Sequence, residues 1–176
     1  TRVAGELRIF GDELLRDDNI RAIWAGRLCS SIMRHMATYY TDGSTSPNPG
    51  PGGFAVIRDL QPWILGSEDG ETTNIRMEGK ALIAALQDAD EAPCVIYTDS
   101  EFWINVVTKW APGWRQRGWT KKGGEIKNLD IVRELYELYS NSQADLRWVR
   151  GHEGDEGNEL ADEWANRARL GERLTK

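Results

Sequence analysis

The chain has 176 residues, enough for one domain with a full hydrophobic core, and its 40% hydrophobic and 28% charged residues are an ordinary globular balance. Its net charge of −6 argues against a general nucleic-acid binder, because such proteins usually carry a basic surface. The sequence has no apolar run near the roughly 18 residues of a membrane span, no signal-peptide layout and no CxxC pair, so we expect a cytoplasmic protein without a zinc or redox motif.

The first part of the chain carries mixed charge and helix-like stretches, but no chemical motif. We therefore expect an N-terminal extension of unknown role over residues 1–36. One domain should follow over 37–172, and a short C-terminal tail over 173–176.

Three strands open the predicted domain. β-Branched and aromatic residues indicate the first strand at 37–42, and short apolar runs indicate a second at 54–57 and a third at 63–65. The run at 47–53, rich in proline and glycine, indicates a turn. Two strands joined by a turn suggest an antiparallel pair.

Strands alternate with helices in the second half of the chain, which indicates an α/β fold whose five-stranded mixed sheet carries helices on both faces. We expect Pro112 to break the helical segment that precedes it, because proline removes a helical hydrogen bond. The expected elements are a helix from Thr72 or Thr73 to about residue 88, a strand at 94–98, a helix from Ser100 to about 109, a helix at 127–140, a strand at 146–149 and a helix from Asn158 to about 170.

A basic segment stands out from this acidic chain between Lys109 and Lys127. It holds six lysines and arginines against Glu125 alone, a net charge of +5, so the remainder of the chain carries −11. This clustering favours a surface for a polyanion over an ordinary solvated face.

Two aspartates stand where predicted strands end, Asp42 after the first strand and Asp99 after the strand at 94–98. Ligands of open α/β sheets bind at the carboxyl ends of strands, so the two aspartates would meet if the strands are neighbours. Glu78 would lean in from the first helix, and Asp162 from the start of the last one. Taken singly, each could be a turn residue, a helix cap or a solvated carboxylate.

Four converging carboxylates repel one another and need a cation. Mg²⁺ prefers oxygen ligands, and two such ions can stabilise the attacking and leaving oxygens of a phosphodiester. The pattern therefore favours magnesium-dependent hydrolysis, with manganese as an open alternative. His152 lies in a glycine-rich acidic loop where it could relay protons, or merely be exposed.

Six segments also carry a resemblance to a known family. They are Tyr-Thr-Asp-Gly-Ser at 40–44, Thr-Thr-Asn-Ile-Arg-Met-Glu at 72–78, Tyr-Thr-Asp-Ser at 97–100, Trp-Arg-Gln-Arg-Gly-Trp at 114–119, Lys-Asn-Leu-Asp at 127–130, and Val-Arg-Gly-His-Glu-Gly at 149–154 followed by Asn158 to Asp162. In order and spacing, over about Ala37 to Arg169, they resemble type 1 ribonuclease H of the bacterial type with a basic handle. The resemblance implies a ribonuclease H-like fold and endonucleolytic hydrolysis of the RNA strand of RNA/DNA hybrids, leaving 5′-phosphate and 3′-hydroxyl ends.

The resemblance also implies roles for single residues. The four carboxylates match the catalytic metal ligands, and His152 matches a loop histidine that assists them. Asn74 matches a contact to the minor groove of the hybrid, where 2′-hydroxyls distinguish RNA from DNA. Thr73 and Asn128 match positions that hold a DNA-strand phosphate, and Asn158 matches a loop residue near the active site. The handle that grips the DNA strand would include Trp114, Arg115, Arg117, Trp119, Lys121 and Lys122. Its tryptophans could pack the handle against the adjacent helix instead of stacking on bases.

Several positions depart from the family pattern without removing a catalytic group, namely Glu71, Ile75, Val132 and the acidic loop at 153–157. They imply weaker affinity for the hybrid. Two alternatives stay open: a nuclease domain that is a fragment of a larger reverse-transcriptase-like polypeptide, and a hybrid-binding module without catalysis. We expect a monomer that acts away from membranes.

Overall fold

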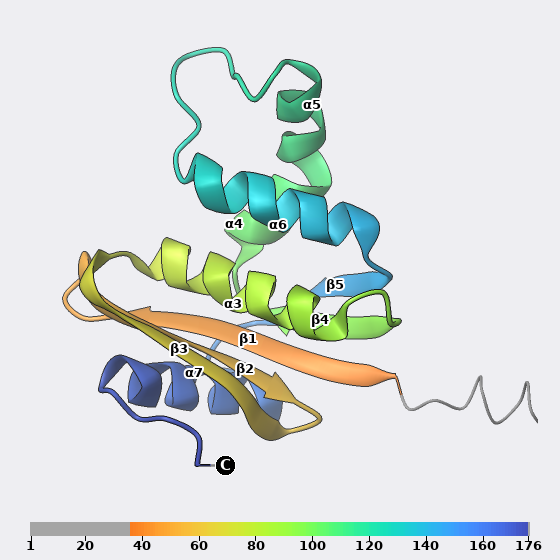
Figure 1. Ribbon diagram of the computed structural model, residues 1–176. Coiled ribbons are helices and arrows are strands. Elements are labelled where there is room, and N and C mark those ends of the chain that lie inside the picture. The colour runs from red at the N-terminus through yellow and green to blue at the C-terminus, as the bar shows by residue number, and fades with distance from the viewer. Residues whose placement is uncertain (1–35, 176) are drawn as a thin grey trace, which may run out of the picture. The chain divides into compact units, whose positions relative to one another are not determined.

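The computed structural model describes residues 36–175, so the extension predicted over 1–36 lies, except for Met36, outside the described residues (Figure 1). Within the described part, no helix has both the length and the apolar character needed to cross a bilayer. The elements in chain order are β1 (Ala37–Thr45), β2 (Gly50–Arg58), β3 (Gln61–Thr72), α3 (Asn74–Ala89), β4 (Cys94–Thr98), α4 (Glu101–Asn105), the π-helical turn η1 (Val106–Trp110), α5 (Ala111–Gln116), α6 (Leu129–Asn141), β5 (Ala144–Trp148) and α7 (Glu156–Arg169).

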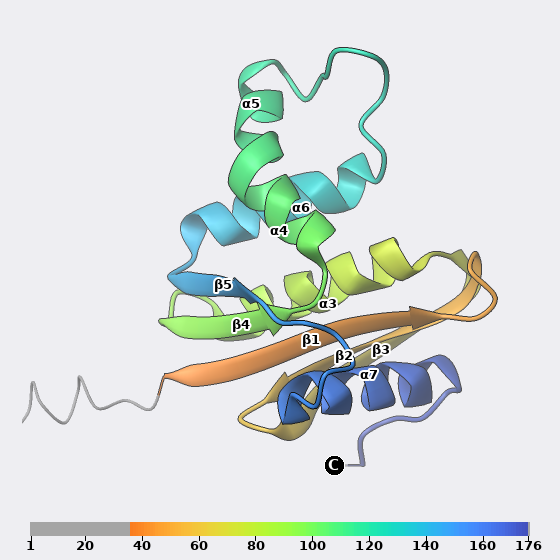
Figure 2. The ribbon, with the colours of Figure 1, turned by 180° about the vertical axis from the view of Figure 1, so that it is seen from behind.

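The five strands form one mixed sheet in the order β3-β2-β1-β4-β5. β1, β2 and β3 pair antiparallel, whereas β4 and β5 run parallel to β1. α7 covers β1 and β2 on one face, and α3 covers β1 on the other, with α6 packed beyond α3 (Figures 1 and 2). The predicted mixed sheet with helices on both faces is thereby confirmed.

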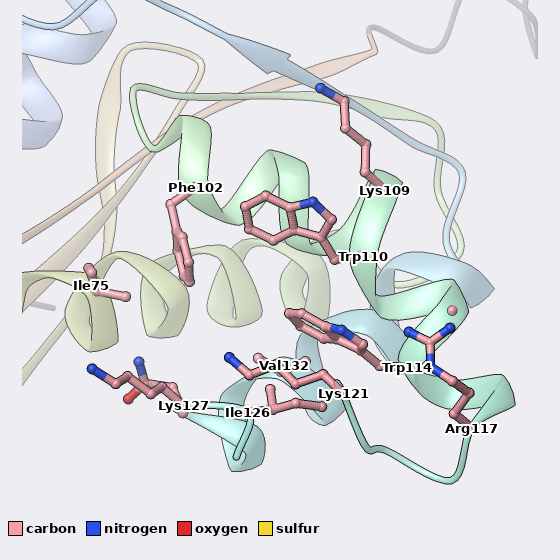
Figure 3. Close-up of a pocket in the computed structure, with 12 residues that line it drawn as sticks. Ile75, Phe102, Lys109, Trp110, Trp114, Arg117, Lys121, Ile126, Lys127 and Val132 are labelled. Atoms are coloured by element: carbon pink, nitrogen blue, oxygen red, sulfur yellow. The ribbon is translucent and has the colours of Figure 1, made fainter. Parts of the chain in front are cut away.

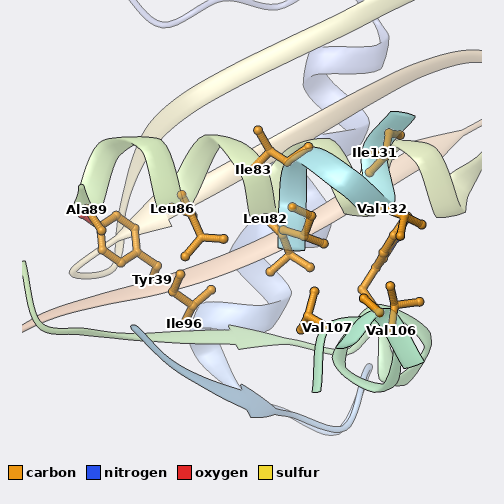
Figure 4. Close-up of a cluster of buried hydrophobic side chains, with 14 of the residues drawn as sticks. Tyr39, Leu82, Ile83, Leu86, Ala89, Ile96, Val106, Val107, Ile131 and Val132 are labelled. Carbon is orange, nitrogen blue, oxygen red and sulfur yellow. The ribbon is translucent and has the colours of Figure 1, made fainter. Parts of the chain in front are cut away.

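The main hydrophobic core lies between α3 and the sheet and continues into the contact of α3 with α6 and η1 (Figure 4). Leu82 and Ile96 fill its sheet side, while Val106 and Val132 fill its outer side, and all four are fully buried. Each such side chain contributes about 1.5–3 kcal/mol of burial free energy. The fully buried Trp103 donates its indole N–H to the carbonyl of Ile75 at 2.7 Å, so this buried donor is paired.

The first hairpin differs from the prediction because β2 begins at Gly50, inside the run assigned to a turn. Both neighbouring helices approach this strand closely. A side chain at Gly52 would collide with Met77 of α3, and one at Gly53 would collide with the backbone of α7. These glycines therefore serve close packing in a strand, and only residues 46–49 make the turn.

The prediction that Pro112 breaks a helix was wrong, because the chain stays helical from Glu101 to Gln116. The intervening turn is π-helical, and the Ala111 N–H reaches back to the Val106 carbonyl. A proline normally clashes with the carbonyl four residues before it. The wider π turn relieves this clash, and Pro112 then occupies the first turn of α5, where its missing N–H is tolerated.

Candidate active site

Parallel pairing of β1 with β4 brings two aspartates to one edge of the sheet. Thr41 is the register partner of Thr98, and each threonine is followed by an aspartate, Asp42 or Asp99. Asp42 retains only 8% of its accessible surface, and its Oδ1 accepts the Gly43 N–H at 2.7 Å. The strand order thus places the two strand-end aspartates next to each other, as predicted.

Glu78 joins this edge because α3 lies directly on β1. A side chain at Gly43 would collide with the backbone of Met77 and Glu78, so only glycine permits this approach. The Ser100 hydroxyl donates to Glu78 Oε2 at 2.6 Å and fixes one of its oxygens. The sequence had indicated Ser100 only as a helix cap, but its side chain makes no cap hydrogen bond.

Asp162 comes from the other face of the sheet, on α7. Asn166, one turn later, donates to the Asp162 carbonyl at 3.0 Å and accepts the Ser44 hydroxyl at 2.7 Å. These contacts tie α7 to the end of β1. Asp162 thereby approaches Asp42 closely enough to raise the pKa of that carboxyl.

Electrostatics show that the four predicted carboxylates share one neighbourhood. Burial, followed by the charge of Asp99, raises the pKa of Asp42 well above its ordinary value, and the charges of Asp162 and Glu78 add to the rise. Burial also raises the pKa of Glu78, with Asp99 adding and the Ser100 hydrogen bond opposing. Such mutual destabilisation of ionised groups is the state that a bound cation relieves.

The chemistry of these donors fits a hard divalent cation, since all four are carboxylates. Among residues 36–175, no three His, Cys, Asp or Glu side chains converge tightly enough to form a complete ion cage by themselves. Mg²⁺ does not require such a cage, because it keeps several waters and usually binds through one or two carboxylates plus substrate phosphates.

The loop between β5 and α7 closes over Asp99. Gly151 packs against Asp99 so closely that an added Cβ would stand 2.8 Å from its Oδ2. Burial raises the pKa of Asp99, while the nearby His152 and a hydrogen bond from Asn158 oppose the rise. His152 is exposed and adopts a left-handed backbone conformation, with φ at 59°. The loop thus places an imidazole beside the Asp99 carboxylate.

Asn158 is 2% exposed and stands behind Asp99. Its backbone N–H donates to Asp155 Oδ1, the cap of α7, at 2.9 Å, and its side-chain oxygen has no hydrogen-bond partner among the described residues. The resemblance implied that Asn158 lies near the active site, and its hydrogen bond to Asp99 agrees with that position. Its burial indicates support of Asp99 more than direct contact with a substrate.

The predicted phosphate-binding residues cluster around an arginine that the sequence reading had not singled out. Thr73 caps α3 and accepts the Arg76 backbone N–H at 3.3 Å. Arg76 Nη1 donates to Asn128 Oδ1 at 3.2 Å. Asn74 lies beside Thr73 and accepts two hydrogen bonds from Thr45, at the end of β1. In the sequence, only the position of Arg76, three residues after Thr73, could have indicated that it belongs to this cluster.

The basic segment borders a cavity of about 600 Å³ beside α6 (Figure 3). Trp110 and Trp114 line it with ring centroids 6.1 Å apart, and Arg117 and Lys121 also lie on it. Ile75 and Val132, two departures from the family pattern, line the same cavity. A cavity with aromatic walls and cationic edges suits a nucleic-acid strand.

Two other handle residues, Trp119 and Arg115, contact α6, although the Arg115 side chain stays 54% exposed. Trp119 meets Tyr136 edge-on at 5.9 Å, and Arg133 lies over its ring. Arg115 stacks over Tyr136 and pairs loosely with Glu137 at 3.8 Å. These two predicted substrate contacts therefore hold the handle against α6, whereas Lys122 is exposed and does not line the cavity.

Comparisons with known proteins agree with this geometry. A family model described as RNase H matches residues 34–169. The Ribonuclease H of Granulibacter bethesdensis is 44% identical over 137 residues, which are 74% of this chain and 90% of that protein. The crystal structure of LC9-RNase H1, a type 1 RNase H with the type 2 active-site motif, matches with a TM-score of 0.67 and 29% identity over 78% of this chain and 74% of that one. The prototype foamy virus protease–reverse transcriptase matches with a TM-score of 0.65 and 22% identity over 80% of this chain and 21% of that one, a likeness of fold alone.

Proposed function

The chain belongs to the ribonuclease H family, and from that premise we propose that it hydrolyses the RNA strand of RNA/DNA hybrids at Asp42, Glu78, Asp99 and Asp162. One observation carries the assignment of the site: a buried Asp42 whose ionisation is opposed by three further carboxylates. Carboxyl groups with strongly perturbed pKa values cluster at functional sites, which supports this assignment. The enzyme is an RNA–DNA hybrid endoribonuclease.

The four carboxylates would hold magnesium, as two ions when substrate is present, and manganese is an alternative. The bound metal supplies Lewis-acid stabilisation of the negative charge that develops at the scissile phosphodiester. The protein prepares its side of the site in advance, since Ser100 orients Glu78 and Asn158 supports Asp99. Rigid ligands lose little freedom on binding, which favours a well-defined substrate geometry.

His152 is the proposed proton carrier. Attack of water on phosphorus forms a new P–O bond and breaks the bond to the 3′-oxygen, which leaves 5′-phosphate and 3′-hydroxyl ends. One proton must leave the attacking water, and another must reach the departing 3′-oxygen. An exposed imidazole beside Asp99 can exchange protons with solvent and with either oxygen.

The cleavage test uses a hybrid labelled on each strand in turn, with duplex DNA and single-stranded RNA of the same sequence. We expect magnesium-dependent cutting of the RNA strand of the hybrid alone. Chelation by EDTA should stop it, and magnesium should restore it. Equal cutting of duplex DNA, or no cutting, contradicts the proposed function. Binding without turnover under either metal would support the hybrid-binding module instead.

The handle is proposed to bind the DNA strand, and its cationic residues should contribute unequally to hybrid binding. Arg117→Gln and Lys121→Gln should each weaken hybrid binding a few-fold and reduce the slope of log K against log salt by about 1, because each releases one counterion fewer. Arg115→Gln removes the same charge from a side chain that faces Tyr136 and Glu137, so its slope should change less. Fluorescence anisotropy in EDTA at several salt concentrations measures this, and equal slopes for all three variants would contradict it.

The domain boundaries, the monomeric state and the cytoplasmic location inferred from the sequence stay predictions. The boundaries can be checked by limited proteolysis of the full chain. The monomeric state can be checked by light scattering of the purified protein.

A further inference from the structure

Two side-chain amides assigned to substrate binding have their oxygen atoms occupied inside the protein. Asn74 Oδ1 accepts the Thr45 backbone N–H at 2.7 Å and the Thr45 hydroxyl at 2.6 Å. Asn128 Oδ1 accepts Arg76 Nη1 at 3.2 Å. A backbone N–H and a guanidinium can only donate, so the atom that faces each of them must be the amide oxygen. The orientation of both amides is therefore fixed by their neighbours.

The opposite side of each amide carries two unused N–H groups. Within residues 36–175, neither the Asn74 nor the Asn128 Nδ2 donates a hydrogen bond to a protein acceptor, and both side chains are partly exposed. A planar amide with its oxygen turned inward directs its NH₂ group away from that contact. Both residues consequently offer donors, and not acceptors, to whatever binds there.

We propose that Thr45 and Arg76 are positioning residues that hold these amides as donors toward the nucleic acid. This rests on the proposed function. Asn128 then donates to phosphate oxygens, which are acceptors only. Asn74 donates to the minor groove, where every base pair offers an acceptor whichever way it is oriented. A flipped amide would set oxygen against oxygen, so donor orientation permits binding that does not depend on sequence.

Arg76 is built to orient a neighbour and not to bind phosphate itself. Its guanidinium forms two hydrogen bonds with Asp130, at 3.0 and 2.8 Å, in addition to the one with Asn128. Its backbone N–H is held by Thr73. The fixed fork of an arginine suits this triple contact, whereas a lysine has no such geometry. Asp130 is 65% exposed, so its main connection to the fold is this pair.

The decisive variant is Asp130→Ala, because two explanations predict opposite signs. If Asp130 acted only through its charge, its removal would strengthen binding to a polyanion. If Asp130 anchors Arg76, and Arg76 orients Asn128, its removal should weaken binding about 5- to 10-fold. Asp145→Ala is the matched control, since Asp145 pairs with Arg147 on β5 and has a similarly exposed side chain. Hybrid binding by anisotropy in EDTA gives the dissociation constants.

Thr45 is tested by two variants, one that removes its hydroxyl and one that keeps it. Thr45→Val removes the hydroxyl donor but leaves the backbone N–H, so we expect KM for the hybrid to rise about 3-fold with a smaller change in kcat. Thr45→Ser keeps the hydroxyl and should restore KM. Melting temperatures of both variants show whether the fold is intact. A purely structural role would lower stability in both without this split.

These outcomes distinguish failure of the positioning role from failure of the proposed function. Tighter or unchanged binding by Asp130→Ala overturns the positioning role of Arg76, and equal KM for the two Thr45 variants overturns that of Thr45, even if the enzyme cleaves hybrids. Failure of the wild-type protein to cleave overturns the proposed function. The binding measurements in EDTA do not depend on cleavage, and weaker binding by Asp130→Ala alone would still support the orientation of Asn128.

Discussion

A carboxylate lies near each end of α3 where the helix meets the sheet, Asp88 on the helix itself and Asp42 on β1, and their surroundings are opposite. Asp88, near the C-terminal end of the helix, accepts hydrogen bonds from Tyr39, Arg58 and Trp63 at 2.8, 3.1 and 2.9 Å. Asp42, near the N-terminal end, has a single backbone donor and three carboxylates as neighbours. One end satisfies its charge within the protein, whereas the other leaves it to be satisfied by something bound.

The three donors to Asp88 also pack against one another. Arg58 lies 5.7 Å from the Tyr39 ring centroid and 5.0 Å from that of Trp63, so one cation bridges two aromatic faces and Asp88. Burial, followed by the hydrogen bond to Asp88, raises the pKa of Tyr39 above its ordinary value. This end therefore resembles ordinary structural support. The contrast teaches that substitutions at the two ends should affect different properties.

The largest effect is expected at the unsatisfied end. Asp42→Asn should lower kcat for hybrid cleavage at least roughly 1000-fold, about 4 kcal/mol, because it removes the charge of a proposed metal ligand while keeping the shape. Single-turnover cleavage at saturating magnesium measures it. Retention of a tenth of the wild-type rate would place Asp42 outside the catalytic centre.

His152→Ala should come next, with cleavage slowed roughly 100-fold, because water can replace a proton carrier in part. The residue is exposed, so the melting temperature should stay unchanged. Exogenous imidazole should recover some of the lost rate. A variant as inactive as Asp42→Asn would show that the imidazole does more than move protons.

Asp88→Ala should show the converse pattern. It leaves the Tyr39 hydroxyl, Arg58 and the Trp63 indole without their shared acceptor, so the free energy of unfolding should fall by about 1–3 kcal/mol. Urea denaturation measures the loss, and cleavage per folded molecule should be unaffected. Glu91→Ala, an exposed carboxylate nearby, serves as the charge-matched control. Equal destabilisation by both would remove the special role of Asp88.

The smallest effect is a gain in stability from Asp42→Asn. The folded-state pKa of Asp42 is raised, so its stabilising contribution is present below the unfolded pKa near 3.8 and is lost as pH rises through the folded pKa. The variant should therefore be more stable than wild type at neutral pH in EDTA, on the order of 1 kcal/mol, with a flatter dependence on pH. Thermal melts from pH 4 to 8 test this. A less stable variant at pH 7 would show that Asp42 is already compensated.

The sequence anticipated the unsatisfied end far better than the satisfied one. Asp42 and Asp99 could be predicted because strand ends and short motifs are local signals. Thr45, Arg76 and Ser100 could not, because their roles arise only when α3 meets β1, the start of α6 and the turn after β4. The network around Asp88 was equally invisible, since its four residues are spread from position 39 to position 88.

The errors in the fold have the same origin. Gly52 and Gly53 suggested a turn by composition, but they belong to a strand because Met77 and α7 leave no room for side chains. Pro112 suggested a helix end, but the π turn before it absorbs the misfit. In each case a contact or a turn geometry outweighed a local preference.

The bare Cα of Gly43 sets the spacing across the proposed catalytic centre. The backbone of α3 rests on the strand at the point where Glu78 begins, with no side chain between them. The distance between Asp42 and Glu78 is thus set by direct contact between the backbones of β1 and α3. Even one methyl group at residue 43 would push the two backbones apart while leaving all four carboxylates chemically intact, and the proposed cation site would lose its fit.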